Sequence, residues 1–262
     1  ITKQSRPYGL TVPADLGSSS VYIIEVNPRS SRTVPFISKV TGIPVIKLAT
    51  HVMLGRTLIE QGYKGGLQPE PPMVSVKAPV FSMSKLTGVD TYLGPEMKST
   101  GEVMGIDTNL EAAVAKALIA ASLMLPQSGK LLVTIADRDK PEAVPWLKTL
   151  GGMDYELYAT EGTATLMRGL GLNVTQINKA DQAEPNAYSV VVDGTVDAVV
   201  NTVEEVAAAR RDGFEIRRAA TERRIPCYTS MDTVRAAVEA LIGGSRDYHV
   251  ATTTAYVKGE VL

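Results

Sequence analysis

The sequence is poor in the residues that build disulfides and transition-metal centres. Its 262 residues include a single cysteine, Cys227, and only two histidines. One cysteine cannot form an internal disulfide, which fits a reducing compartment, and two isolated histidines do not make a zinc-type site. Aromatic residues make up only 5% of the chain, so we expect a core of Val, Leu, Ile, Ala and Met.

An excess of one charge and a long apolar run are also missing. The 27 basic and 28 acidic residues give a net charge of −1, so no strongly basic surface points to a nucleic-acid or membrane partner. No apolar stretch reaches about 18 residues, and no signal-peptide pattern opens the chain. We therefore expect a cytoplasmic, soluble globular protein. Because the chain starts at Ile1 rather than Met, we also expect a piece of a longer protein.

Strand and helix patterns alternate in the second half of the sequence. The predicted strands cover residues 131–135, 155–158, 174–177, 198–201 and 225–228. The predicted helices cover residues 141–150, 163–169, 215–223 and 233–241. Strands separated by helices predict right-handed crossovers and a mainly parallel sheet covered on both faces, which is a Rossmann-like three-layer α/β domain.

The first half is read as short strands and loops punctuated by prolines. Residues 21–26 and 74–80 have strand patterns, and Asp107 is the expected N-cap of a helix over 108–125. Residues 127–130 read as a linker, which predicts two domains, 1–128 and 129–262. The polar, Thr-rich stretch 245–262 is expected to be a tail.

A carboxylate, an amide and a guanidinium follow one another at the end of the first predicted strand. Alternation places Glu25 and Asn27 on one face, and Arg29 joins them if the strand persists. Carboxylate and amide oxygens suit Mg²⁺, and a guanidinium grips phosphate. Taken alone, the triplet more often marks an exposed strand edge with ordinary polar side chains than a metal site.

The residues around this triplet form motifs long and ordered enough to identify a family. Residues 25–36 (EVNPRSSRTVPF) resemble the metal-binding strand of ATP-grasp ligases, in particular the second synthetase half of the carbamoyl-phosphate synthase large chain. Further matching stretches are residues 38–44 (SKVTGIP), 52–55 (VMLG), 77–82 (KAPVFS) and 93–105 (LGPEMKSTGEVMG). Residues 1–20 fit this family poorly.

The resemblance implies a ligase that makes carbamoyl phosphate from bicarbonate, ATP and glutamine-derived ammonia, for pyrimidine and arginine synthesis. Glu25 and Asn27 would hold Mg²⁺ or Mn²⁺ on the phosphates of the substrate ATP, and Arg29 would be the catalytic residue that steadies the transferred phosphoryl group. A small glutaminase subunit and other large-chain copies would be partners. The phosphate-covering loop and adenine pocket of the family have no equivalent before residue 21, so this chain by itself is expected to be inactive.

A second group of polar residues lies where the predicted parallel strands end. Lys140, Thr160, Gly162, Thr163 and Lys179 combine positive charge, hydroxyls and a helix amino terminus, which together suit a phosphate. Asn201 and Thr202 follow the next strand. Thr and Asn at such places also cap helices, and the residues themselves leave both interpretations open.

This pattern is similar to the methylglyoxal-synthase-like regulatory domain that ends the same large chain. The resemblance implies that an effector nucleotide such as UMP or IMP binds through the seven residues just named. Glu161 and the pair at 204–205 depart from the family pattern, and carboxylates there would repel a phosphate. An alternative is a stand-alone nucleotide- or metabolite-binding module. A lyase of the methylglyoxal synthase type would need a histidine in the site, and both His51 and His249 fall outside this region.

Overall fold

A computed structural model describes residues 29–64, 66, 69–82, 90–91, 97–202, 207–243 and 248–261. By contacts between Cα atoms, residues 1–31 and 32–262 form two compact units, and the elements below belong to the second unit. Before the sheet domain these are α1 (Thr33–Thr41), α2 (Val45–Met53), β1 (Val74–Val80), β2 (Gly101–Asp107) and α3 (Leu110–Ala120). After them come β3 (Gly129–Thr134), the short 3₁₀ helix η2 (Asp137–Asp139), α4 (Lys140–Gly151), β4 (Tyr155–Thr160), α5 (Glu161–Gly169), β5 (Val174–Ile177), α6 (Ser189–Val192), β6 (Ala198–Asn201), α7 (Ala207–Arg223), β7 (Cys227–Tyr228), α8 (Met231–Gly243) and α9 (Thr253–Lys258).

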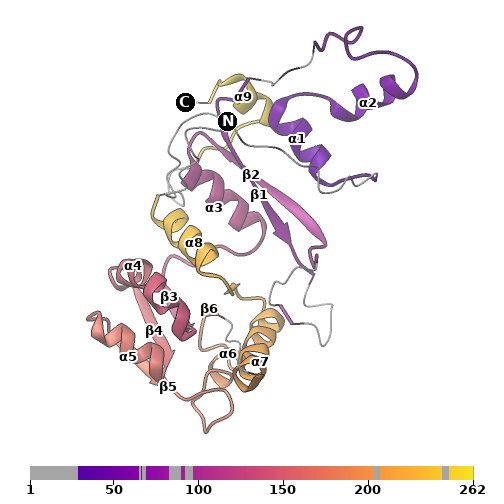
Figure 1. Ribbon diagram of the computed structural model, residues 1–262. Helices are drawn as coiled ribbons and strands as arrows, with labels where there is room; N and C mark the ends of the chain where they lie inside the picture. Colours follow the sequence, from indigo (N-terminus) through magenta and orange to yellow (C-terminus); the bar gives the residue numbers. More distant parts are fainter. Residues whose placement is uncertain are drawn as a thin grey trace, which may run out of the picture. The chain divides into compact units, whose positions relative to one another are not determined.

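The second half of the chain folds around a five-stranded parallel sheet (Figure 1). Its strand order is β5-β4-β3-β6-β7, and each neighbouring pair runs parallel. The chain therefore winds outward from β3 in one direction through β4 and β5, then returns to the other side of β3 with β6 and β7. The predicted α/β class with a mainly parallel sheet is confirmed, and the strands at 174–177 and 198–201 have the predicted bounds.

Alternate residues of the central strands enter two different cores. Leu131 and Val133 of β3 pack into one core with the apolar sides of α4, α5 and α8, whereas Leu132 packs into the other with α6 and α7. Both faces of the sheet are therefore covered by helices, as the alternation of strands and helices predicted. Trp146, the only tryptophan in the sequence, lies in the first core and is 4% exposed.

The interpretation of the first half as short strands and loops was wrong for residues 33–41, which form the helix α1, while the apolar stretch around His51 is helical and belongs to α2. Pro35 lies in the first turn of α1, and Pro44 immediately precedes α2. Proline is tolerated at both places because the first amides of a helix have no intrahelical acceptor. Prolines that seemed to interrupt strands therefore mark the beginnings of helices.

A two-stranded antiparallel sheet precedes the parallel one. Strand β1 has the predicted bounds, but its partner β2 was missed, because its sequence (GEVMGID) contains two glycines. Gly105 allows α3 to lie against β2: a Cβ added there would come within 2.0 Å of the Ala113 carbonyl oxygen. Helix α3 also packs against α8, so it joins the small sheet to the parallel domain (Figure 1).

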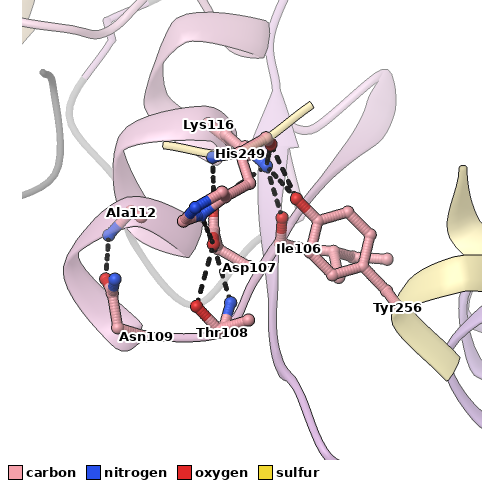
Figure 2. A network of polar contacts seen from close by, with 8 residues as sticks. All are labelled: Ile106, Asp107, Thr108, Asn109, Ala112, Lys116, His249 and Tyr256. Carbon is pink, nitrogen blue, oxygen red and sulfur yellow. Dashed lines mark hydrogen bonds and ion pairs between the residues drawn. The ribbon is translucent and has the colours of Figure 1, made fainter. Parts of the chain in front are cut away.

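Asp107 was predicted to cap the helix, and that prediction was wrong. The helix begins at Leu110, and the Asn109 side chain accepts the cap hydrogen bond from the Ala112 amide at 2.8 Å. Asp107 is instead the last residue of β2 and is completely buried, paired with Lys116 at 2.9 Å (Figure 2). The helix also ends earlier than predicted, at Ala120.

The expected polar tail is also wrong for the residues described at the carboxyl end. Thr252 caps α9 by accepting from the Ala255 amide, and Tyr256 in that helix is 4% exposed. The His249 amide donates to Asp107 Oδ2 at 3.1 Å, and Tyr256 shares the Lys116 ammonium with Asp107 (Figure 2). A Thr-rich sequence resembles a tail because its contacts lie more than 130 residues away.

The predicted linker at 127–130 is partly strand, since Gly129 and Lys130 open β3. Just before it, Leu125 is buried, and the Tyr155 hydroxyl donates to the Pro126 carbonyl. In the sequence, the two-stranded sheet comes before residue 128 and the five-stranded sheet comes after it. The division into two domains at residue 128 stays a prediction. Within the described ranges, no helix combines the length and hydrophobicity needed to cross a bilayer.

Candidate functional site

The predicted effector residues lie where the parallel strands end. Register pairs Thr134 of β3 with Asn201 of β6, and Thr160 of β4 with Ile177 of β5. Strands β3 and β6 are neighbours in the sheet although β4 and β5 come between them in the sequence, so their carboxyl ends form a topological switch point. Ligands of open α/β sheets bind in the crevice at such a point. We call this edge the switch-point crevice.

Lys140 and Gly162 meet at the amino end of α5. The Lys140 ammonium lies 3.0 Å from the place that a Cβ on Gly162 would take, so the absent side chain leaves room for the cation. Helix α5 begins at Glu161 with Thr160 as its N-cap, two residues earlier than predicted, and the Thr160 side chain makes no cap hydrogen bond. The first amides of α5 and the Lys140 charge therefore lie in one place, which favours an anion.

A carboxylate already occupies part of this electropositive region. Lys140 Nζ lies 2.5 Å from Asp137 Oδ1, and the Asp137 side chain is 87% exposed. The hydrogen bond from Lys140 and its positive charge hold the pKa of Asp137 below its ordinary value, and the charge of Lys179 acts in the same direction. Both predicted lysines thus act on one carboxylate, although Lys140 begins α4 and Lys179 follows β5.

Thr163 and Thr202 hold the chain segment that follows β3 at the edge of the crevice. The Thr163 hydroxyl oxygen accepts from the Ile135 amide at 3.1 Å, and that of Thr202 accepts from the Ala136 amide at 2.8 Å. Both threonines are buried. Their oxygens therefore fix the loop that leads from β3 to Asp137, which is a role that sequence analysis did not assign to them.

Asn201 is buried, and each end of its amide has a partner. Its Nδ2 donates to Thr134 Oγ1 at 2.7 Å, and its Oδ1 accepts from Arg217 Nη1 at 2.7 Å. Arg217 was missed by the sequence analysis, because two adjacent arginines in α7 look alike. The available signal in the sequence was Gly213, a glycine one helical turn before Arg217. In the structure, a Cβ at Gly213 would come within 2.6 Å of Arg217 Nη1.

Lys179 is exposed after β5, and its amide donates to Gln182 Oε1 at 3.2 Å. Glu161 is also exposed, in the first turn of α5, where the helix dipole favours a carboxylate. Residues 204–205 lie outside the described residues. The structure therefore brings Lys140, Gly162, Thr163 and Thr202 to one edge of the sheet, while effector binding there stays a prediction.

The predicted metal ligands, Glu25 and Asn27, lie outside the described residues, as does the predicted strand 21–26. Arg29 is described: it is exposed, and it lies in neither a helix nor a strand. Among the residues that the structure describes, no group of three His, Cys, Asp or Glu side chains could hold a metal ion. The metal site therefore stays a prediction.

Neither histidine reaches the switch-point crevice. His51 belongs to α2, where its Nδ1 lies 3.1 Å from Gln61 Oε1. His249 contacts Asp107 beside the two-stranded sheet (Figure 2). The geometry thus agrees with the sequence-based argument against a lyase that works through a histidine.

Comparison with known proteins shows which families the two parts are similar to. Residues 142–229, which include most of the parallel sheet and α5, match the family model of the MGS-like domain. Residues 13–61 match the model of the carbamoyl-phosphate synthase L chain, ATP binding domain, so the expectation that residues 1–20 fit this family poorly was wrong for residues 13–20. One part of the chain is therefore similar to a segment of this ATP binding domain, and the other is similar to an MGS-like domain.

One relative covers both parts. The chain is 51% identical over 243 residues to the carbamoyl phosphate synthase large chain of Thermomicrobium roseum, an alignment that covers 92% of this chain and 22% of that protein. The predicted resemblance to the carbamoyl-phosphate synthase large chain is confirmed, and the chain spans about a fifth of this relative's length.

Among solved structures, the crystal structure of a proposed NADPH:quinone reductase from Bacillus thuringiensis matches 66% of this chain and 80% of its own, with 10% identity and a TM-score of 0.28. A TM-score this low supports no argument about fold or function.

Proposed function

We propose that the chain is the carboxyl-terminal part of a carbamoyl-phosphate synthase large chain and that its parallel-sheet domain senses a nucleotide effector. The observation that carries the proposal is the extent of the shared sequence, which runs through both the ATP-binding segment and the MGS-like domain. The whole enzyme would be a glutamine-hydrolysing ATP-dependent ligase of the cytoplasm. It would serve pyrimidine and arginine synthesis, with a glutaminase subunit and other large-chain copies as partners.

The amino-terminal segment would contribute ligands to an ATP site completed by residues outside this chain. The carboxylate of Glu25 and the carboxamide of Asn27 are oxygen donors, which fits Mg²⁺ or Mn²⁺. When bound, such an ion would neutralise phosphate charge. Arg29 would hold the transferred phosphoryl group through its guanidinium, since this transfer depends on positioning and charge stabilisation. We expect the isolated chain not to turn over.

This part of the proposal is tested in a complete large chain assembled with its glutaminase subunit. Glu25→Gln and Asn27→Ala should each raise the divalent-metal and ATP concentrations needed for carbamoyl phosphate formation, because a hard cation loses an oxygen ligand. Glu70→Gln is the control, since Glu70 is exposed in the loop before β1. Unchanged metal and ATP dependence in both variants would remove these residues from the metal site.

The effector would bind in the switch-point crevice through its phosphate. The first amides of α5, the Lys140 ammonium and the Lys179 charge favour an anion there, and the anion would compete with Asp137 for both lysines. UMP and IMP are the nucleotides that the resemblance suggests.

Calorimetric titration of the 262-residue chain with UMP and with IMP tests the effector site. Lys179→Ala should abolish the binding that the wild-type chain shows, whereas Lys148→Ala, in the last turn of α4, should leave it unchanged. Asp137→Asn should tighten it, because a competing carboxylate is removed. No heat for either nucleotide at millimolar concentration would mean that the domain does not sense them. Binding by the chain without any effect on the complete enzyme would favour the stand-alone binding module.

A further inference from the structure

The guanidinium of Arg217 is shared between two segments that are far apart in the sequence. Its Nε and Nη2 donate to the two carboxylate oxygens of Asp90 at 2.9 and 2.6 Å, and its Nη1 donates to Asn201 Oδ1 at 2.7 Å. The Arg217 side chain is 1% exposed and that of Asp90 is 34% exposed, so the guanidinium is shielded from water while its carboxylate partner is partly exposed. A planar guanidinium can hold two acceptors at fixed angles, which an ammonium cannot do.

Two features support this arrangement: a glycine leaves room for the guanidinium, and a lysine contacts the backbone of Asp90. Gly213 lies one turn before Arg217 in α7, and a Cβ there would press on both Arg217 Nη1 and Asn201 Oδ1, at 2.6 and 3.2 Å. On the other side, Lys98 Nζ donates to the backbone carbonyl of Asp90 at 3.2 Å, so the Asp90 backbone has a hydrogen-bond partner of its own.

The contacts continue from Asn201 into the switch-point crevice. Asn201 Nδ2 donates to the Thr134 hydroxyl at the end of β3, and the Thr202 amide donates to the Thr134 carbonyl at 3.1 Å. Thr202 in turn accepts from the Ala136 amide, on the loop that leads to Lys140. A single series of hydrogen bonds therefore joins Asp90, in the first half of the chain, to the edge of the parallel sheet.

We propose that Arg217 is a positioning residue that couples the switch-point crevice to the segment carrying Asp90. The biological role of this coupling rests on the proposed function. Asn201 is a predicted effector residue that also accepts from Arg217, so a bound effector and Asp90 would influence each other through it. Coupling of this kind is reciprocal, so a change at Asp90 must alter the crevice as much as a ligand in the crevice alters Asp90.

The test compares two carboxylate-to-amide substitutions, one at the partner of Arg217 and one at the partner of its neighbour Arg218. Asp90→Asn replaces one carboxylate oxygen by an amide that faces the Arg217 donors. Glu222→Gln is the matched control, because Glu222 accepts from Arg218 Nε at 2.7 Å on the same helix and is 60% exposed. Amide hydrogen exchange of the 262-residue chain, resolved by residue, is measured for both variants and for Arg217→Lys. The lysine variant keeps the charge but cannot hold Asp90 and Asn201 together.

Asp90→Asn and Arg217→Lys should speed exchange of the Ala136 and Thr202 amides about tenfold, within the range of couplings measured inside one hydrogen-bonded network. Amides of β4, such as that of Ala159, should not change, and Glu222→Gln should change neither group. Equal acceleration at Ala159 would overturn the proposal, because Arg217 would then only stabilise the fold. No acceleration at Ala136 and Thr202 would overturn it as well.

Nucleotide affinity provides a second readout that separates this proposal from the proposed function. If UMP or IMP binds the wild-type chain, Asp90→Asn should weaken that binding at least about fivefold, as allosteric couplings typically do, while Glu222→Gln should not. An unchanged affinity in Asp90→Asn would overturn the coupling. If neither nucleotide binds, the proposed effector site fails, and the exchange experiment still decides the role of Arg217.

Discussion

The Lys116 ammonium lies 2.9 Å from Asp107 Oδ2, and the Asp107 side chain has no exposed surface. Lys116 also donates to the Ile106 carbonyl and the Tyr256 hydroxyl, both at 2.8 Å, and to the His249 carbonyl (Figure 2). One cation therefore ties the end of β2 and helix α3 to the carboxyl-terminal residues. Of these residues, Ile106, Lys116, His249 and Tyr256 border a cavity of about 340 Å³ that Met104, Tyr248 and Thr253 also line.

Removing the Asp107 charge should destabilise the chain strongly. Asp107→Asn leaves the Lys116 ammonium partly buried without its counter-ion, and breaking a buried pair costs about 3–5 kcal/mol. The free energy of unfolding in urea measures the effect. Glu156→Gln is the control, because its pair with Lys130 is exposed and such pairs contribute about 0–1 kcal/mol. Similar losses in both variants would show that burial of the Asp107 pair has no special weight.

The contribution of Asp107 should disappear in acid. Burial alone would raise its pKa, but the hydrogen bonds from Lys116 and from the amides of Thr108 and His249, with the Lys116 charge, outweigh burial and hold the pKa of Asp107 below its ordinary value of 3.8. A carboxyl whose pKa is lower in the folded state contributes stability above its unfolded pKa and loses it as the pH falls through the folded pKa.

The difference in unfolding free energy between wild type and Asp107→Asn should therefore be constant from pH 7 to about pH 5 and shrink toward pH 3. Urea unfolding at several pH values measures this difference. A difference that is undiminished at pH 3, or that shrinks instead between pH 7 and 9, contradicts the assignment.

The carboxyl-terminal segment should contribute to stability through Tyr256. Its hydroxyl accepts from Lys116 and donates to the His249 carbonyl at 2.6 Å, so Tyr256→Phe loses two hydrogen bonds in a buried place. We expect a loss of about 1–3 kcal/mol in thermal or urea unfolding. Tyr248→Phe, at a ring that is 42% exposed, should stay within about 0.5 kcal/mol of wild type. Equal stability of both variants would mean that the segment contributes nothing as a unit.

Gly213 should not tolerate a methyl group. Gly213→Ala places a Cβ against Arg217 Nη1 and Asn201 Oδ1, and displacement of these packed groups should cost about 1–3 kcal/mol. In Gly169→Ala, also at a helical glycine, the new Cβ meets nothing within 4 Å, so the higher helix propensity of alanine should make it neutral or stabilising by up to about 1 kcal/mol. If both changes stabilise the chain, the contact at Gly213 is not restrictive.

The sequence alone determined the parallel-sheet domain and the place of its candidate site. The strands at 74–80, 174–177 and 198–201 have the predicted bounds, because the two-residue period of a strand is a local property. Lys140, Gly162, Thr163 and Thr202 come together because the carboxyl ends of parallel strands share one edge. The motifs of residues 25–105 identified the relationship to the large chain without any coordinates.

Only the tertiary structure decided what Asp107, Arg217 and Tyr256 do. Asp107 stands at a place where a helix cap was plausible, and its burial depends on His249, which is 142 residues away. Arg217 differs from Arg218 through Asp90, at a separation of 127 residues. Charges joined over such distances leave no period or spacing in the sequence, since their energy comes from desolvation and pairing that exist only once the chain has folded.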